Sequence, residues 1–210
     1  MNKHALMTNY AAVTITFNPA VDKSTSVPML VPEKKLACTK PLLEPGGGGI
    51  NVARAIHKLG GDALAVFPAG GYNGGLLKRL LDKEGVASLP LPVINDSREN
   101  LVVLDSAANL QYRFGMPGPE LSPAEWQQCL RALEQAANPA FFVASGSLSP
   151  GMPVDMFARV AAIAKKKNVP LVADTSGEVL AAALEEGVYL IKPNVGELAA
   201  LAGKEELGRQ

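Results

Sequence analysis

The chain has 210 residues, 48% hydrophobic and 19% charged, and its 20 basic and 20 acidic side chains cancel to a formal charge of zero. That length suits one domain with a small appendage and allows a sizeable core, and the balanced charge gives no support for binding nucleic acid or an anionic membrane. No apolar run approaches the roughly 20 residues needed to cross a bilayer. The two cysteines, Cys38 and Cys129, lie too far apart for a dense disulfide framework, so we expect a cytoplasmic protein.

The first part of the chain predicts short strands around a glycine-rich turn. Residues 11–17 (AAVTITF) combine β-branched and aromatic side chains and end at an Asn-Pro pair, which predicts a strand entering a turn. Residues 24–44 alternate apolar and polar side chains between prolines, a pattern that suits the edge strands of a small β appendage. Gly46–Gly49 precede apolar residues at helical spacing, so we expect a glycine loop and a helix that ends near Gly60.

The remaining segments alternate strands with helices. Ser122 begins a helix that has Pro123 at its first helical position and Glu125 as a possible cap partner. Further strands are expected at residues 63–68, 101–105, 111–114, 140–144, 171–173 and 189–191, and further helices at 73–84, 156–167, 178–186 and in KPNVGELAALAG. This order is typical of parallel βαβ units, so we expect an α/β fold of one domain.

Polar residues follow several predicted strands. They are Asp22, Ser147, Asp174, Lys192 and Asn194. In open parallel sheets ligands bind outside the carboxyl ends of the strands, so these side chains are candidates for a common site. The tetraglycine Gly46–Gly49 could bind an anion or sugar hydroxyls through backbone N–H groups, or it could be only a flexible turn. Neither a Walker-type nor a dinucleotide-binding glycine pattern is present.

Six segments together carry a family resemblance: NPAVD, EPGGGGINVARAI, GGDALAVFPAGG, QYRFGMPGPEL, SGSLSPG and LIKPNVGEL. They resemble the PfkB-type carbohydrate kinases of the ribokinase superfamily, and within it most closely the minor-type bacterial 6-phosphofructokinases. The resemblance implies a three-layer α/β sandwich with a mainly parallel sheet and a β lid at about residues 24–44 and 97–115. It also implies ATP-dependent phosphorylation of fructose 6-phosphate to fructose 1,6-bisphosphate in glycolysis, with tagatose 6-phosphate or fructose 1-phosphate as alternative substrates.

The resemblance assigns sugar-site roles to seven residues. It implies contacts to the sugar hydroxyls, to the phosphate or to the ligand from the lid for Asp22, Lys35, Gly47, Gly48, Asn51, Arg98 and Ser147. Arg98 and Ser147 match positions that hold the sugar phosphate, and a guanidinium offers a planar fork of donors that fits phosphate oxygens. From the residues alone, Arg98 could be an exposed charge and Ser147 a turn or cap residue.

The KPNxxE segment resembles the family's nucleotide site. Lys192 and Asn194 match positions near the nucleotide phosphates, whereas Glu197 and Asp174 match positions near Mg²⁺, so the resemblance implies MgATP as the second substrate. Amide and carboxylate oxygens suit this cation. Asn194 and Glu197 could equally form the capping box of a helix, and Asp174 could head an ordinary turn.

The chain departs from the family pattern in two places. Relatives carry an arginine in a KLRC-like run where this chain has Ala37. The GAGD motif that holds the catalytic aspartate in the family is missing, so we expect a chain that is incomplete at its C-terminus and shows no appreciable turnover. A non-catalytic sugar-phosphate-binding or dimerisation fragment is the alternative, and a fragment that cannot fold is a third. The resemblance also implies a homodimer formed through the β lid.

Overall fold

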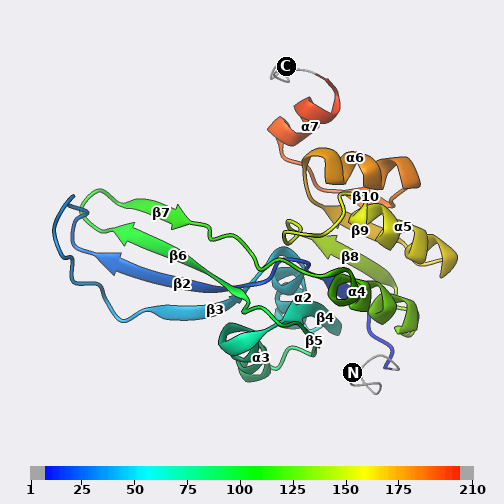
Figure 1. Ribbon diagram of the computed structural model, residues 1–210, viewed down its shortest axis with the longest axis horizontal. Coiled ribbons are helices and arrows are strands. Elements are labelled where there is room, and N and C mark those ends of the chain that lie inside the picture. Colours follow the sequence, from blue (N-terminus) through cyan, green and yellow to red (C-terminus); the bar gives the residue numbers. More distant parts are fainter. Residues whose placement is uncertain (1–7, 204–210) are drawn as a thin grey trace.

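The chain forms two β-sheets, a six-stranded sheet in the core and a four-stranded sheet outside it (Figure 1). The computed structural model describes residues 8–203. The core sheet has the strand order β10-β9-β8-β1-β4-β5, and all its neighbouring strands are parallel. Its strands are β1 (Ala12–Ile15), β4 (Ala63–Ala69), β5 (Ser88–Pro92), β8 (Phe141–Ser145), β9 (Leu171–Asp174) and β10 (Leu190–Ile191). The expected mainly parallel α/β sheet is confirmed.

Helices cover both faces of the core sheet and give the three expected layers. They are α2 (Gly48–Lys58) and α3 (Gly71–Glu84) on one face, and α4 (Pro123–Gln135), α5 (Met156–Lys166) and α6 (Gly177–Glu186) on the other, with α7 (Val195–Leu201) beside α6. Side chains alternate between the two layers, as strand geometry requires. In β1, Val13 and Ile15 join the cluster with α4 and α5, whereas Ala12 joins the one with α2 and α3.

The second sheet projects from the core as a lid (Figure 1). Its order is β3-β2-β6-β7, with β2 and β6 parallel and the outer pairs antiparallel. The strands are β2 (Ala20–Val27), β3 (Leu42–Gly46), β6 (Arg98–Asp105) and β7 (Leu110–Phe114). The short edge strands expected within residues 24–44 lie at the two ends of this segment, and residues 28–41 form a loop. The lid sheet instead begins at Ala20, so Asp22 lies within a strand rather than in a turn.

One core strand was not expected from the sequence. β5 (SLPLP) contains Pro90 and Pro92, which remove two donors from any ladder. The strand is tolerated because it lies at the edge of the sheet and pairs only with β4, so one side of its backbone needs no partner strand. The segment that follows β5 leads directly to Arg98 at the start of β6.

The expected cap of α4 is confirmed and has a second role. The Glu125 carboxylate accepts hydrogen bonds from the Ser122 amide (2.8 Å) and the Ser122 hydroxyl (2.7 Å). It also accepts one from the Ile94 amide at 2.7 Å, which ties α4 to the segment before Arg98. The bonds from Ser122 and Ile94 hold the pKa of Glu125 below its usual value although the side chain is buried.

Glu125→Ala should therefore lower the free energy of unfolding by about 1–2 kcal/mol, since it removes the cap of α4 and the bond that ties the Ile94 amide to this helix. Because the folded state depresses this pKa, the stabilisation is present above the usual pKa of glutamic acid and is lost as pH falls through the lowered value. Urea denaturation at pH 7 and at pH 3 measures both effects. The exposed Glu134→Ala, on the same helix, is the control, and equal midpoints for the two variants at pH 7 would contradict this account.

Candidate functional site

The core sheet changes its winding direction at β1. The chain runs from β1 outward through β4 and β5, then returns to the other side of β1 and runs outward through β8, β9 and β10. At such a switch point the loops after the two central strands separate and leave a crevice at their carboxyl ends. Here the crevice receives the loop after β8, which contains Ser147, and the start of α2 at Gly48.

The glycine loop packs directly on the ends of β1 and β8. Gly47 has a φ of 116°, which only glycine adopts without strain. A Cβ on Gly48 would lie 2.2 Å from the Ser145 Oγ and 2.8 Å from the Gly146 nitrogen. The Thr16 hydroxyl accepts a hydrogen bond from the Ile50 amide at 2.8 Å and fixes the first turn of α2. The glycines are therefore required by packing as well as being available for ligand contacts.

A cavity of about 280 Å³ opens at this edge of the core sheet and contains several of the expected site residues. Gly48, Ser147, Asp174 and Glu197 all line it. Asp174 accepts a hydrogen bond from the Ser145 hydroxyl at 3.0 Å and forms an ion pair with Lys192 at 3.2 Å. The structure thus brings Asp174, Glu197 and Ser147 to one cavity, with Lys192 at Asp174.

The KPNxxE segment forms the capping box that its spacing allowed. The Asn194 Oδ1 accepts from the Glu197 amide at 2.9 Å, and the Glu197 Oε2 accepts from the Asn194 amide at 2.8 Å. This arrangement holds the Glu197 side chain at the entrance of α7 beside the cavity. Among residues 8–203 no group of three metal-ligating side chains gathers. Asp174 and Glu197 fit Mg²⁺ in the way common for nucleotide complexes, where one or two carboxylates are completed by phosphates and water.

Arg98 and Ser147 are brought together through a third residue, Asn18. The Arg98 guanidinium donates from Nη2 to the Asn18 carbonyl and from Nη1 to the Met116 carbonyl, both at 3.0 Å. The Asn18 side chain donates in turn to the Ser147 Oγ at 3.1 Å. Burial lowers the pKa of Arg98, opposed by the Asp22 carboxylate. Arg98 is therefore a held, partly desolvated cation and not a free surface charge.

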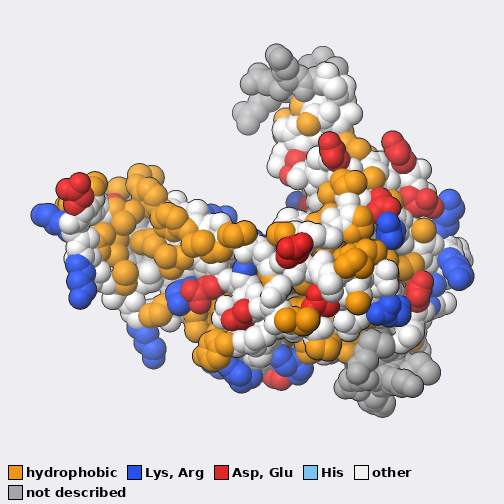
Figure 2. Space-filling model, in the orientation of Figure 1, with side chains coloured by type: hydrophobic (Ala, Val, Ile, Leu, Met, Phe, Trp, Pro, Cys, Tyr) orange, Lys and Arg blue, Asp and Glu red, His pale blue; other side chains and the backbone are white. Residues whose placement is uncertain are grey.

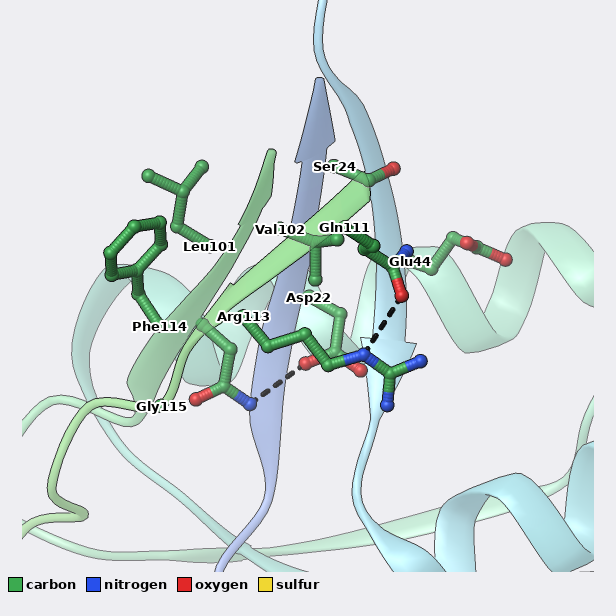
Figure 3. A pocket seen from close by; sticks show the side chains of 10 residues that line it. Asp22, Ser24, Glu44, Leu101, Val102, Gln111, Arg113, Phe114 and Gly115 are labelled. Atoms are coloured by element: carbon green, nitrogen blue, oxygen red, sulfur yellow. Dashed lines mark hydrogen bonds between the residues drawn. The ribbon is translucent and has the colours of Figure 1, made fainter. Parts of the chain in front are cut away.

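A second cavity, of about 530 Å³, lies on the polar face of the lid sheet. Figure 3 shows Asp22, Gln111 and Arg113 on this face. Asn100 donates to the Asp22 Oδ1 at 2.9 Å, and the Arg113 Nε donates to the Gln111 Oε1 at 2.9 Å. Asp22 also lies against the glycine loop, because a Cβ on Gly46 would be 2.1 Å from its Oδ2. The lid thus presents a carboxylate and a guanidinium near the root of the sheet.

Six of the expected residues lie outside the linings of these two cavities, namely Lys35, Gly47, Asn51, Arg98, Lys192 and Asn194. Lys35 is exposed in the loop of residues 28–41, and this loop turns at the end of the lid farthest from the core (Figure 1). Asn51 is exposed on the first turn of α2, where its Oδ1 accepts from the Arg54 Nη1 at 3.4 Å. The single chain therefore gathers the core residues of the expected site and leaves the lid lysine apart.

Arg54 was not singled out in the sequence, yet it holds the glycine loop in place. It donates to both carboxylate oxygens of Glu84 at 2.6 and 2.7 Å, to Glu44 at 3.1 Å and to the Pro45 carbonyl at 3.1 Å. The hydrogen bonds from Arg54 lower the pKa of Glu84. This network links α2, the end of α3 and the lid strand β3 just before Gly46. Its only sequence signal is an arginine on the helix that follows the glycines.

These features agree with the comparison to known proteins. A family model described as pfkB family carbohydrate kinase matches residues 7–209. The chain belongs to this family. ATP-dependent 6-phosphofructokinase isozyme 2 of Mycobacterium tuberculosis is 47% identical over 196 residues, which cover 93% of this chain and 58% of that protein. The Escherichia coli protein of the same name is 44% identical over 193 residues, which cover 91% of this chain and 62% of that protein.

Solved structures of the family share the fold. The crystal structure of phosphofructokinase-2 from Escherichia coli in complex with fructose-6-phosphate has a TM-score of 0.90 at 43% identity, covering 95% of this chain and 66% of that chain. The tetrameric inhibited form of that enzyme gives a TM-score of 0.89 at the same identity. The PfkB-type resemblance and the ribokinase-like fold are thus confirmed, while the chain spans about three-fifths of the length of its curated relatives.

Within residues 8–203, no helix combines the length and apolar character that crossing a membrane requires.

The glycine packing leads to a test of stability. Gly48→Ala should lower the free energy of unfolding by about 1–3 kcal/mol, because the methyl group meets backbone atoms of Ser145 and Gly146 that cannot rotate away. The control is Gly75→Ala in α3, where the nearest atom is the flexible end of Arg79 at 3.6 Å, and where the change should be neutral or stabilising. Equal urea midpoints for Gly48→Ala and the unchanged protein would show that the loop is looser than this packing implies.

Proposed function

We propose that the protein binds a sugar phosphate, in the first place fructose 6-phosphate, as the phosphoryl acceptor of an ATP-dependent kinase. The observation that carries this proposal is the junction of Arg98, Asn18 and Ser147 at the carboxyl edge of β1 and β8. The printed names of the relatives support the same class, since two of them are ATP-dependent 6-phosphofructokinases. Tagatose 6-phosphate and fructose 1-phosphate remain the alternative acceptors.

The chemistry of the junction suits a phosphate group. Arg98 is partly buried, so its charge is screened less than that of an exposed arginine. Its Nε is buried and has no hydrogen-bond partner among the described residues. Each Nη donates one of its two N–H groups to a backbone carbonyl, so the other N–H of each is available to a ligand. The exposed Ser147 hydroxyl adds a donor on the cavity side. A phosphate accepts several hydrogen bonds at once and its charge opposes that of Arg98, which a neutral ligand cannot do.

The sugar hydroxyls are assigned to the root of the lid. Asp22 offers two carboxylate oxygens that accept hydrogen bonds, and Asn100 orients one of them. The backbone of Gly47 and Gly48 approaches without side chains, and the exposed Asn51 side chain follows on α2. Carboxylate, amide and bare backbone together match the donors and acceptors of a polyol.

The nucleotide is assigned to the cavity of about 280 Å³ at the edge of the core sheet, on the side of Asp174 and Glu197. Lys192 and Asn194 would contact the ATP phosphates, and Asp174 with Glu197 would hold Mg²⁺ directly or through water. The cation, when bound, neutralises charge on the phosphates. The chain's own residues hold these groups in place before binding, since Asp174 is fixed by Ser145 and Glu197 by the cap of α7.

We further propose that the lid pairs with the lid of a second copy. Apolar side chains gather over the lid in Figure 2. Leu110, Tyr112 and Phe114 alternate along β7, so they share one face of the lid sheet, and all three are exposed. An exposed apolar row of this kind on a sheet with open edges favours association. A partner lid would cover these side chains, and Lys35 would then act at the site of the assembled pair.

The binding proposal is tested by isothermal titration of the 210-residue chain with the three sugar phosphates. Fructose 6-phosphate should bind, and Arg98→Ala should weaken it by at least tenfold, because charged hydrogen bonds to phosphate are lost. Arg79→Ala is the control, since Arg79 lies on α3 beside Tyr72. A coupled assay with MgATP should detect no ADP release, because no GAGD segment occurs in these residues. Equal affinities for Arg98→Ala and Arg79→Ala would refute the assignment of the phosphate site.

The lid pairing is tested by light scattering after size exclusion. Phe114→Glu places a charge on a side chain that is 47% exposed within the apolar patch, so the mass should fall from that of two chains to that of one. Leu59→Glu, at an 88% exposed position at the end of α2, should leave the mass unchanged. A single-chain mass for the unchanged protein at micromolar concentration would overturn this part of the proposal.

A further inference from the structure

Asn18 connects the two expected phosphate-binding residues although no motif assigned it a role. It lies between β1 and β2, where the chain passes from the core to the lid, and it is only 7% exposed. Its side-chain nitrogen donates to the Ser147 Oγ at 3.1 Å and to the Leu148 carbonyl at 3.3 Å. Its own carbonyl accepts from the Arg98 Nη2 at 3.0 Å. One buried residue thus contacts Arg98 and Ser147 directly.

The contacts determine which way the Asn18 amide faces. A backbone carbonyl can only accept, so the group that faces the Leu148 oxygen must be the Asn18 NH₂ and not its oxygen. The same NH₂ group therefore donates to the Ser147 Oγ. Because Ser147 accepts this bond, its hydroxyl proton is free to point elsewhere, and the exposed side of Ser147 faces the core cavity.

The opposite side of the Asn18 amide is closed. Its Oδ1 is buried and has no hydrogen-bond partner among the described residues. A Cβ on Gly118 would lie 2.2 Å from this oxygen, so the loop before α4 fits against Asn18 only because it carries a glycine there. The amide cannot rotate outward without displacing this loop. Asn18 is therefore held in the orientation that directs the Ser147 hydroxyl proton toward the cavity.

We propose that Asn18 is a positioning residue of the phosphate site. Through its NH₂ group it orients the Ser147 hydroxyl as a donor toward the cavity, and through its carbonyl it fixes the Arg98 guanidinium beside that hydroxyl. An acceptor-only group such as a phosphate dianion is favoured at this place, because the Ser147 oxygen already accepts from the Asn18 NH₂ and offers its hydroxyl proton to the cavity. This inference rests on the proposed function, since it concerns how the same sugar-phosphate site is built.

The experiment measures fructose 6-phosphate binding to the 210-residue chain by titration calorimetry. Asn18→Ala should weaken binding about tenfold, because the Ser147 hydroxyl can then turn toward the Leu148 carbonyl. Asn18→Asp should weaken it about a hundredfold, since a carboxylate would accept the Ser147 proton and repel the phosphate. Asn95→Asp is the matched control, because that amide is exposed and donates to the Glu120 carbonyl.

A double-mutant cycle separates positioning from a general structural effect. If Asn18 acts through Ser147, then Asn18→Ala should add little to Ser147→Ala, whereas an independent structural role would add its full effect. Gly118→Ala provides a second route, since its methyl group should displace Asn18 while keeping the amide, and it too should weaken binding. Circular dichroism and urea midpoints identify variants that do not fold. If Asn18→Ala does not fold, the affinity of Gly118→Ala for fructose 6-phosphate decides whether Asn18 has the positioning role.

The outcomes distinguish this inference from the proposed function. If the unchanged chain binds fructose 6-phosphate and Arg98→Ala weakens binding, but Asn18→Ala and Gly118→Ala bind as the unchanged chain does, the positioning role is wrong and the function stands. Full additivity in the cycle would lead to the same conclusion. If the unchanged chain binds no sugar phosphate, the proposed function fails and the role of Asn18 fails with it.

Discussion

The carboxyl end of β1 is the constraint on which the rest of the structure depends, because the chain crosses there twice between the core and the lid. It leaves along Phe17 and Asn18 and returns through Gly47 and Gly48 into α2. Both crossings are tied to the neighbouring strand ends by hydrogen bonds, such as that from the Ser149 hydroxyl to the Phe17 carbonyl at 3.0 Å. The crossings leave no room for a side chain at Gly48. The chain topology therefore requires the glycine loop, and the bare backbone of this loop is also available to a ligand.

This crowded edge also explains why polar groups are buried in an otherwise apolar core. The buried polar residues there are Thr16, Asn18, Ser145 and Ser149. Thr16 holds the start of α2, and the other three link neighbouring loops. Each bond is stronger in low dielectric than in water, and each would be costly if broken, so the network holds its members in one arrangement. A site built this way pays little to become ordered when a ligand binds.

Sequence patterns predicted the order of the core elements, the lid and the caps at Ser122 and Asn194, because periodicity and capping are local. They did not reveal β5, whose prolines argue against a strand until its edge position is known. They also missed the parallel pairing of β2 with β6, which joins Ala20 to Arg98 across a long stretch of chain. Asn18 escaped notice for the same reason, since its Asn-Pro pair indicates only a turn until Ser147 and Arg98 are placed beside it.

The row of paired residues nearest the core connects the lid sheet to the phosphate site. Ala20 pairs with Gly46 on one side and with Arg98 on the other. With adjacent strands about 4.8 Å apart, the start of the glycine loop and Arg98 lie about 10 Å from each other in one hydrogen-bonded row. Arg98 and Gly46 thus belong to one row of the lid sheet, whereas Ser147 follows β8 of the core. Asn18 contacts both Arg98 and Ser147, so it ties this row of the lid sheet to the loop after β8.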